Sequence, residues 1–150
     1  MSDALLRVAQ LAALSPLDID PARETQERID YEDGGFMLRY QYLFDPSDFV
    51  FVNAYLAVAP DLEEAQSDFE QFEEGVADLD FESQRDDRLD WPDDSATWRL
   101  VQKERTIGHA ILLRRGVATL FLVFIGFVFE GDKALRDLLR PKWEALGRPE

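Results

Sequence analysis

The amino-acid sequence predicts an α+β domain in which an antiparallel sheet of about six strands is covered by helices on both faces, as an α/β/α sandwich. Consecutive β-type runs between residues 36 and 129 are joined by short turn signals, which is typical of antiparallel pairing. The longest run, Val117–Phe129, has apolar residues at both odd and even positions, so both of its faces should be buried. Residues 61–76 and 132–146 repeat apolar side chains at spacings of three and four, which predicts helices that cover the sheet.

The first 30 residues are expected to form a helical appendage, and residues 31–150 a single domain. A first helix should extend to about Ala13, because apolar side chains keep helical spacing up to that point. Asp20 and Pro21 indicate a second helix start, since aspartate caps helices and proline suits their first position. This short second helix should end near Arg28.

The chain from Phe36 to Ala59 is expected to form a β-hairpin around a turn at residues 45–48. Its first arm alternates apolar and polar side chains, and its second arm is apolar on nearly both faces. The two strands should span residues 36–44 and 49–59. Pro60 ends the hairpin, and Asp61 is a suitable cap for the next helix. That helix, over residues 61–76, carries seven acidic residues and no basic residue.

The second half of the chain is expected to contain four strands and a last helix. Turn signals, including Arg115-Gly116, divide it into strands at residues 79–89, 97–105, 106–114 and 117–129. Pro141 should kink or restart the final helix because proline cannot donate a backbone hydrogen bond. The predicted order is therefore helix, short helix, two strands, helix, four strands and helix.

Composition limits the classes of partner. The chain has 150 residues, of which 46% are hydrophobic, enough for one sizeable core. A net charge of −15 repels nucleic acid and anionic membrane surfaces, so neither is an expected partner. Residues 1–95 carry 25 acids and 6 bases, whereas residues 96–150 carry 6 acids and 10 bases. This asymmetry has two interpretations: a salt-adapted acidic surface on which the asymmetry has no role, or one acidic face that meets a basic partner.

No catalytic, cofactor-binding or metal-binding residue is predicted. The chain has no cysteine, which excludes disulfides and thiolate metal sites. Its one histidine, His109, lies in a predicted strand. The chain has no Gly-x-Ser-x-Gly motif that would supply a nucleophilic serine for this histidine, so we expect a structural role for His109. Phosphate-binding glycine motifs are missing, and the aspartates of residues 86–94 lack the calcium-loop spacing.

The candidate binding residues are acids of the helix over 61–76 and residues of the following acidic loop. Trp91, beside Pro92, is the best candidate for an exposed aromatic anchor. The residues predicted to contact a partner protein are Glu63, Glu70, Glu73, Trp91, Asp93 and Asp94.

No membrane insertion is expected. As a helix, the 13 residues of Val117–Phe129 would span roughly 20 Å, short of the ~30 Å hydrocarbon core of a bilayer. The N-terminus lacks the basic region of a signal peptide, which predicts a cytoplasmic location. A sheet face left uncovered by helices would predict a homodimer.

Four features together resemble the PsbP-like family, an α/β/α sandwich around an antiparallel sheet. They are the hairpin Phe36–Ala59, the acidic helix opening with Pro60-Asp61-Leu62-Glu63-Glu64, the Arg114-Arg115-Gly116 turn into Val117–Phe129, and the closing helix Asp132–Leu146. The resemblance covers about three quarters of the chain. It implies an accessory role, such as that of photosystem II extrinsic subunits, a Ran-binding import factor, bacterial lipoproteins or secretion chaperones. The chain differs from the lipoproteins in lacking a lipidation cysteine, and residues 1–30 are additional.

We therefore expect a non-enzymatic binding or adaptor protein, an accessory subunit of a larger protein assembly. One alternative is an acidic secretion chaperone or an immunity-type inhibitor of a basic protein. A second alternative is a helix-grip domain that binds a small ligand, which would need a deep apolar cavity beneath the last helix.

Overall fold

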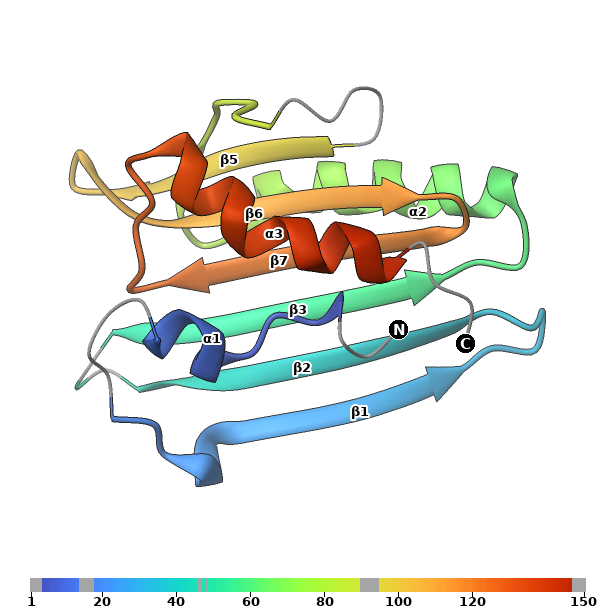
Figure 1. Ribbon diagram of the computed structural model, residues 1–150, viewed down its shortest axis with the longest axis horizontal. Coiled ribbons are helices and arrows are strands. Elements are labelled where there is room, and N and C mark those ends of the chain that lie inside the picture. Colours follow the sequence, from blue (N-terminus) through green and yellow to red (C-terminus); the bar gives the residue numbers. More distant parts are fainter. Residues whose placement is uncertain (1–3, 14–17, 46, 48, 90–94, 147–150) are drawn as a thin grey trace.

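The computed structural model describes residues 4–13, 18–45, 47, 49–89 and 95–146, and shows an α+β fold around an antiparallel sheet (Figure 1). The sheet has seven strands in the order β1-β2-β3-β7-β6-β5-β4. The strands are β1 (Glu24–Asp30), β2 (Phe36–Asp45), β3 (Val50–Val58), β4 (Glu82–Arg85), β5 (Ser95–Gln102), β6 (Arg105–Arg115) and β7 (Ala118–Ile125). The predicted class and the antiparallel sheet are confirmed, with one strand more than the expected six.

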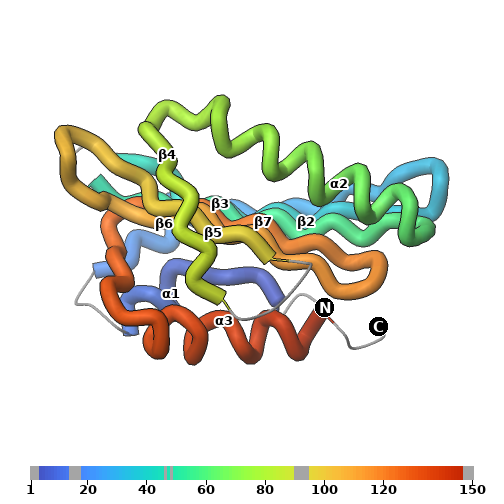
Figure 2. The backbone as a smooth tube through the Cα atoms, turned by 90° about the horizontal axis from the view of Figure 1, so that it is seen from above, coloured from blue at the N-terminus to red at the C-terminus, as the bar shows by residue number. Residues whose placement is uncertain are grey.

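The helices lie on the two sides of the sheet. They are α1 (Val8–Ala12), α2 (Leu62–Gly75) and α3 (Asp132–Leu146), with single 3-10 turns η2 (Pro21–Arg23) and η3 (Val76–Asp78). Figure 2 shows α2 on one side of the strands and α1 with α3 on the other. We call these two sides the α2 face and the α3 face.

The connection through α2 divides the sheet into two halves. After β3 the chain crosses the sheet through α2 to the far edge, forms β4, and returns through β5 and β6 to β7. β7 then pairs with β3 in the middle, from Phe51 opposite Ile125 to Val58 opposite Ala118. The central pair β3–β7 therefore joins two locally connected antiparallel units.

Every residue of β7 is buried, as the apolar run predicts. Its even-numbered residues, such as Leu122, belong to the core cluster that contains Leu135 and Leu139 of α3. Its odd-numbered apolar residues, Phe121, Val123 and Ile125, belong to the cluster that contains Phe69 of α2. The strand is thus covered by apolar side chains on both faces, although it ends at Ile125 rather than at Phe129.

The predicted short helix over residues 21–28 is wrong. Asp20 does cap a turn, because its Oδ1 accepts a hydrogen bond from the Ala22 N–H at 3.0 Å, but this turn ends at Arg23. Residues 24–30 then form the edge strand β1, which pairs with β2 along its whole length. β1 is exposed and polar on both faces, so it lacks the apolar alternation by which strands are recognised in a sequence.

The predicted N-terminal helix is shorter than expected and starts at Val8. Ala4, Leu5 and Leu6 are all fully buried in the core of the α3 face. Three consecutive buried side chains suit an irregular segment laid against the sheet, since a helix would direct them to different sides.

The remaining boundaries differ by a few residues. The third predicted strand, over residues 79–89, is confirmed only over the four residues of β4. The predicted strands over 97–105 and 106–114 are confirmed as β5 and β6, and helix α3 continues through Pro141.

Candidate functional site

The turn between β1 and β2 fixes Asp33 at one end of the α2 face. The Tyr31 N–H donates to the carbonyl oxygen of Gly35 at 2.9 Å. The Gly35 N–H in turn donates to Oδ1 of Asp33 at 2.9 Å. Such a side-chain hydrogen bond is the usual reason for aspartate in a turn, and here it sets the orientation of the carboxylate.

Gly35 brings this turn close to the start of α2. A Cβ atom at Gly35 would lie 2.8 Å from the carbonyl oxygen of Val58 and 3.3 Å from Cδ of Pro60, closer than side chains normally approach. The turn therefore packs directly on Val58, the last residue of β3, and on Pro60, which lies between β3 and α2. Asp33 consequently lies beside the first turns of that helix.

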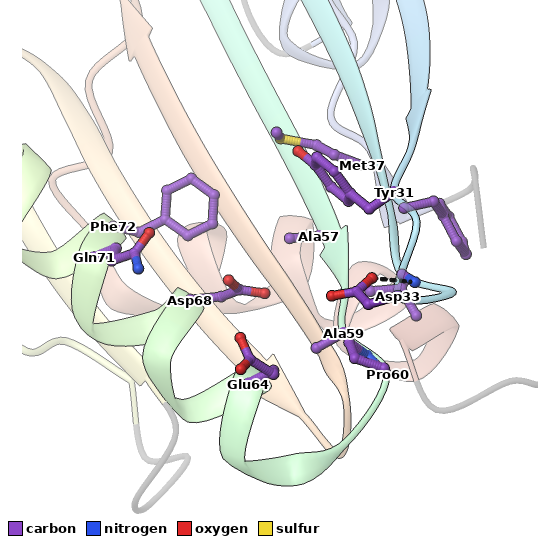
Figure 3. A pocket seen from close by; sticks show the side chains of 13 residues that line it. Tyr31, Asp33, Met37, Ala57, Ala59, Pro60, Glu64, Asp68, Gln71 and Phe72 are labelled. Atoms are coloured by element: carbon purple, nitrogen blue, oxygen red, sulfur yellow. Dashed lines mark hydrogen bonds between the residues drawn. The ribbon is translucent and has the colours of Figure 1, made fainter.

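Helix α2 contributes two carboxylates to the same place. Asp61 caps the helix, since its Oδ1 accepts the Glu64 N–H at 2.8 Å. Because successive helical residues turn by about 100°, Glu64, Asp68 and Gln71 share one side of α2. In Figure 3 the carboxylates of Glu64 and Asp68 point away from α2, and that of Asp33 faces Asp68 from the opposite wall.

Together these residues line a hollow of about 520 Å³, which we call the acidic hollow after Asp33, Glu64 and Asp68. Its apolar lining includes Tyr31, Phe36, Met37, Ala57, Pro60 and Phe72. Phe72 is held by Phe121, at a ring-centroid distance of 5.1 Å, and by Tyr55, at 6.1 Å. The hollow thus has fixed walls with both a charged part and an apolar part.

The acidic hollow has no neutralising base. None of the described residues that line it is lysine, arginine or histidine. Burial raises the pKa of the Asp68 carboxyl above its ordinary value, and the negative charge of Asp33 raises it further. Glu64 and Asp68 are also one helical turn apart, a spacing at which like charges repel. Negative charge is therefore concentrated here at some cost to the free energy of unfolding.

The charges of α2 are poorly arranged for the helix itself. Acids near a helix N-terminus interact favourably with the helix dipole, and Glu63 and Glu64 lie there. Glu73 and Glu74 lie at the C-terminal end instead, where acids are unfavourable, and the last turn contains no base. Helix stability alone does not account for this acidic surface.

The acidic hollow places carboxylates beside an aromatic wall. The described residues contain no group of three or more His, Cys, Asp or Glu side chains placed to hold a metal ion. An ammonium or guanidinium group on an apolar stem would meet both the carboxylates and the aromatic wall.

A larger hollow on the molecule is electrostatically mixed. It has a volume of about 720 Å³ and contains Arg88, Arg99 and Arg105. Asp86 and Glu130 line it as well, and Arg88 donates to Asp132 at 2.8 Å. Charges of both signs compensate each other there, in contrast to the acidic hollow.

The acids predicted from the sequence lie elsewhere on α2. Glu63 and Glu70 are exposed on the side of the helix that faces away from the acidic hollow. Glu73 forms an ion pair with Arg85 at 3.2 Å. Trp91, Asp93 and Asp94 lie outside the described residues. The predicted contact role of all six residues stays a prediction.

Sequence reasoning missed Asp33, Glu64 and Asp68 as a group. Glu64, Asp68 and Gln71 recur at helical spacing beside the apolar stripe, so the sequence alone could have placed them on one side of the helix. Asp33 could not be added to them, because its place beside α2 depends on how the β1–β2 turn packs on β3.

His109 has the structural role expected from the sequence. It is 1% exposed, and its Nε2 accepts a hydrogen bond from the Phe129 N–H at 2.9 Å. Burial lowers the pKa of His109 to about 4, helped by the positive charges of Arg88 and Arg99. The ring is therefore neutral at pH 7 and ties the segment after β7 to β6.

Two comparisons of the sequence, with family models and with curated proteins, found no match. None of the helices within the described ranges has both the length and the apolar character that crossing a membrane requires.

Proposed function

We propose that this protein is a non-enzymatic protein-binding domain, an accessory subunit that holds a basic segment of its partner at the acidic hollow. The observation that carries the proposal is the convergence of Asp33, Glu64 and Asp68 from two elements, with no basic residue among the described lining.

Electrostatics favours a basic partner over a neutral one. A cation beside Asp33 and Asp68 relieves the repulsion between these two carboxylates, so binding gains energy that the free protein lacks. The partner should also associate quickly at low salt, because the whole first half of the chain is strongly acidic. A screened, salt-sensitive association is the expected signature.

The layered arrangement of helices and sheet is consistent with the accessory role that the PsbP-like resemblance implies. In this proposal the protein acts in the cytoplasm and contacts neither nucleic acid nor membrane. The resemblance supplies no binding residue, so the acidic hollow is proposed from its own geometry and charge.

The acidic chaperone or immunity-type inhibitor remains the alternative, since it would use the same charge. It differs in its complex: one basic protein bound alone, rather than a larger assembly. The hypothesis of a helix-grip domain has less support. It requires a cavity between α3 and the sheet, where the fully buried side chains of Leu135 and Leu139 lie instead.

The test compares two triple variants of the full chain that remove the same charge. D33N/E64Q/D68N neutralises the acidic hollow, and E63Q/E70Q/E73Q neutralises the opposite side of α2. Each tagged protein is used to purify partners from the native host at low and at physiological salt, and the products are identified by mass spectrometry and sized by gel filtration.

We expect a stoichiometric partner with the wild type that is lost with the first triple variant and kept with the second. Loss with the second triple variant only would move the site to Glu63, Glu70 and Glu73. Equal retention by both variants, or a wild-type protein that elutes alone at every salt concentration, would contradict the proposal.

A further inference from the structure

A second hollow lies on the same face of the sheet and is built from aromatic rings. Phe44, Phe49, Phe51 and Phe81 line it, with centroid distances of 5.5 Å for Phe44–Phe49 and 6.1 Å for Phe51–Phe81. Its volume is about 440 Å³. Phe44 is 48% exposed, which is unusual for a phenyl ring that belongs to a cluster. We call this site the aromatic hollow.

The aromatic hollow continues the acidic character of the α2 face. Asp78 and Asp80 line it, and no described residue of its lining is basic. A partner that inserts an apolar side chain here therefore brings its neighbouring residues close to these two aspartates. A basic partner is favoured in this position and an acidic partner is not.

The two hollows lie at opposite ends of the β2–β3 strand pair. Met37 pairs with Ala57 at the acidic end, and Gln41 pairs with Asn53 nearer the aromatic end. Phe51 and Ala57 have the same parity on β3, so they share the α2 face. At about 3.3 Å per residue, the six steps between them correspond to about 20 Å.

Polar groups suited to a peptide backbone lie at the edge of the aromatic hollow, which Asn53 also lines. The side-chain amides of Gln41 and Asn53 are cross-strand neighbours and half-buried. Neither amide has a hydrogen-bond partner among the residues that the structure describes. Each side-chain amide offers an NH2 group that donates and a carbonyl oxygen that accepts, so the pair can bind both the C=O and the N–H groups of an extended chain.

Among the described elements, α2 packs over β6, β7 and β3, where its Phe72 lies against Tyr55. Figure 1 shows no helix behind β1 and β2. The side chains of Met37, Arg39 and Gln41 on this face of β2 are accordingly only half-buried.

The backbone conformation of Phe49 indicates that the aromatic hollow is a binding site. Its φ angle is +52°, in the left-handed region that bulky residues rarely adopt. This backbone is held by the hydrogen bond from the Phe49 N–H to the Asp45 carbonyl at 3.0 Å, and it places the ring between Phe44 and Phe81. Unfavourable backbone conformations of this kind concentrate at binding sites.

We propose that the partner segment is an extended stretch of chain with a basic residue in the acidic hollow and a bulky apolar residue in the aromatic hollow. The distance of about 20 Å sets their separation at about six residues. Gln41 and Asn53 bind the backbone of the segment where it leaves the aromatic hollow. The inference rests on the proposed function and adds the sequence pattern that the partner must carry.

The first experiment selects ligands without a prior candidate. Random 12-residue peptides displayed on phage are selected against the immobilised full-length protein at low salt. We expect enriched peptides with an arginine or lysine and a phenylalanine, tryptophan or leucine separated by about five to seven residues. Enrichment of basic residues without an apolar residue at a fixed separation would overturn the inference.

The second experiment measures binding of the best selected peptide by fluorescence anisotropy. F44S should weaken binding about tenfold, and D68N by a similar factor, because each removes one anchor. The matched controls are L43S, which changes an equally exposed neighbour that does not line the aromatic hollow, and E63Q, on the other side of α2. Both controls should bind within about twofold of the wild type.

The outcomes separate this inference from the proposed function. If D68N weakens binding and F44S does not, binding at the acidic hollow is supported, and the proposal that an extended segment occupies both hollows is wrong. If neither variant weakens binding, both proposals fail. If the wild type forms a dimer that F44S abolishes, the aromatic hollow is a self-association surface and the inference is overturned.

Discussion

Polar groups near the α3 face form hydrogen bonds to the backbone, whereas carboxylates on the α2 face lie close to one another. On the α3 face, the hydroxyl of Tyr40 accepts the Val8 N–H, the hydroxyl of Tyr42 accepts the Asp20 N–H, and Nζ of the buried Lys142 donates to the Leu5 carbonyl. On the α2 face, the carboxylates of the acidic hollow repel one another. On the first face polar groups connect the N-terminal segment to the sheet, whereas on the second the described lining of the acidic hollow contains no base that would neutralise the carboxylates.

The largest contrast should come from shortening one apolar side chain on each face. Leu122 is fully buried on the α3 face, so Leu122→Ala should lower the free energy of unfolding by about 2–5 kcal/mol. Phe44→Ala, on the open part of the α2 face, should lower it by less than about 1 kcal/mol. Urea denaturation measures both, and equal losses would contradict the distinction between a closed and an open face.

Acid should weaken the α3 face through His109. Its folded pKa of about 4 lies below the ordinary value of 6.5, so the unfolded chain binds more protons between these values and stability falls as pH falls from 6.5 to 4. The contribution is roughly 3 kcal/mol. His109→Gln should remove this part of the pH dependence in denaturation curves at pH 7 and 4.5. An unchanged difference between the two pH values would show that His109 is not the titrating group.

The tyrosines allow a smaller test of the same contrast. The hydroxyl of Tyr40 also donates to Oε1 of Glu24 at 2.6 Å, and burial followed by this bond raises its pKa. Tyr40→Phe should cost about 1–2 kcal/mol of the free energy of unfolding, because the buried Val8 N–H loses its acceptor. Hydrogen exchange at Val8 should accelerate as well. Tyr55→Phe on the α2 face is the control, since the Tyr55 hydroxyl has no hydrogen bond within the described residues.

The smallest expected effect has the opposite sign. Asp68→Asn should raise the free energy of unfolding at pH 7 by about 0.2–0.5 kcal/mol, because it removes the cost of burying the Asp68 carboxylate and its repulsion from Asp33. The folded pKa of Asp68 is raised, so the gain should be present at neutral pH and disappear as pH falls to the ordinary aspartate value of 3.8. Glu63→Gln should give no gain, since an acid near the helix N-terminus is favourable. Destabilisation by Asp68→Asn would contradict an uncompensated acidic hollow.

Helix α2 shows how much of the candidate site could be predicted. Its bounds, its Asp61 cap and its acidic surface follow from the sequence, because capping and apolar periodicity are local properties. Which of its acids face a hollow could not be predicted. That depends on the position of the β1–β2 turn, and β1 itself had no signal because its side chains are polar and exposed on both faces.

The sequence by itself determined the α+β class, the antiparallel hairpins, the buried character of β7 and the structural role of His109. Each of these follows from the periodicity or the chemistry of neighbouring residues. Only the tertiary structure decided that β3 pairs with β7, that residues 24–30 are a strand, and that Asp33 faces Asp68. Such contacts join residues that are distant along the chain, and they depend on packing between elements rather than on the preference of any one segment.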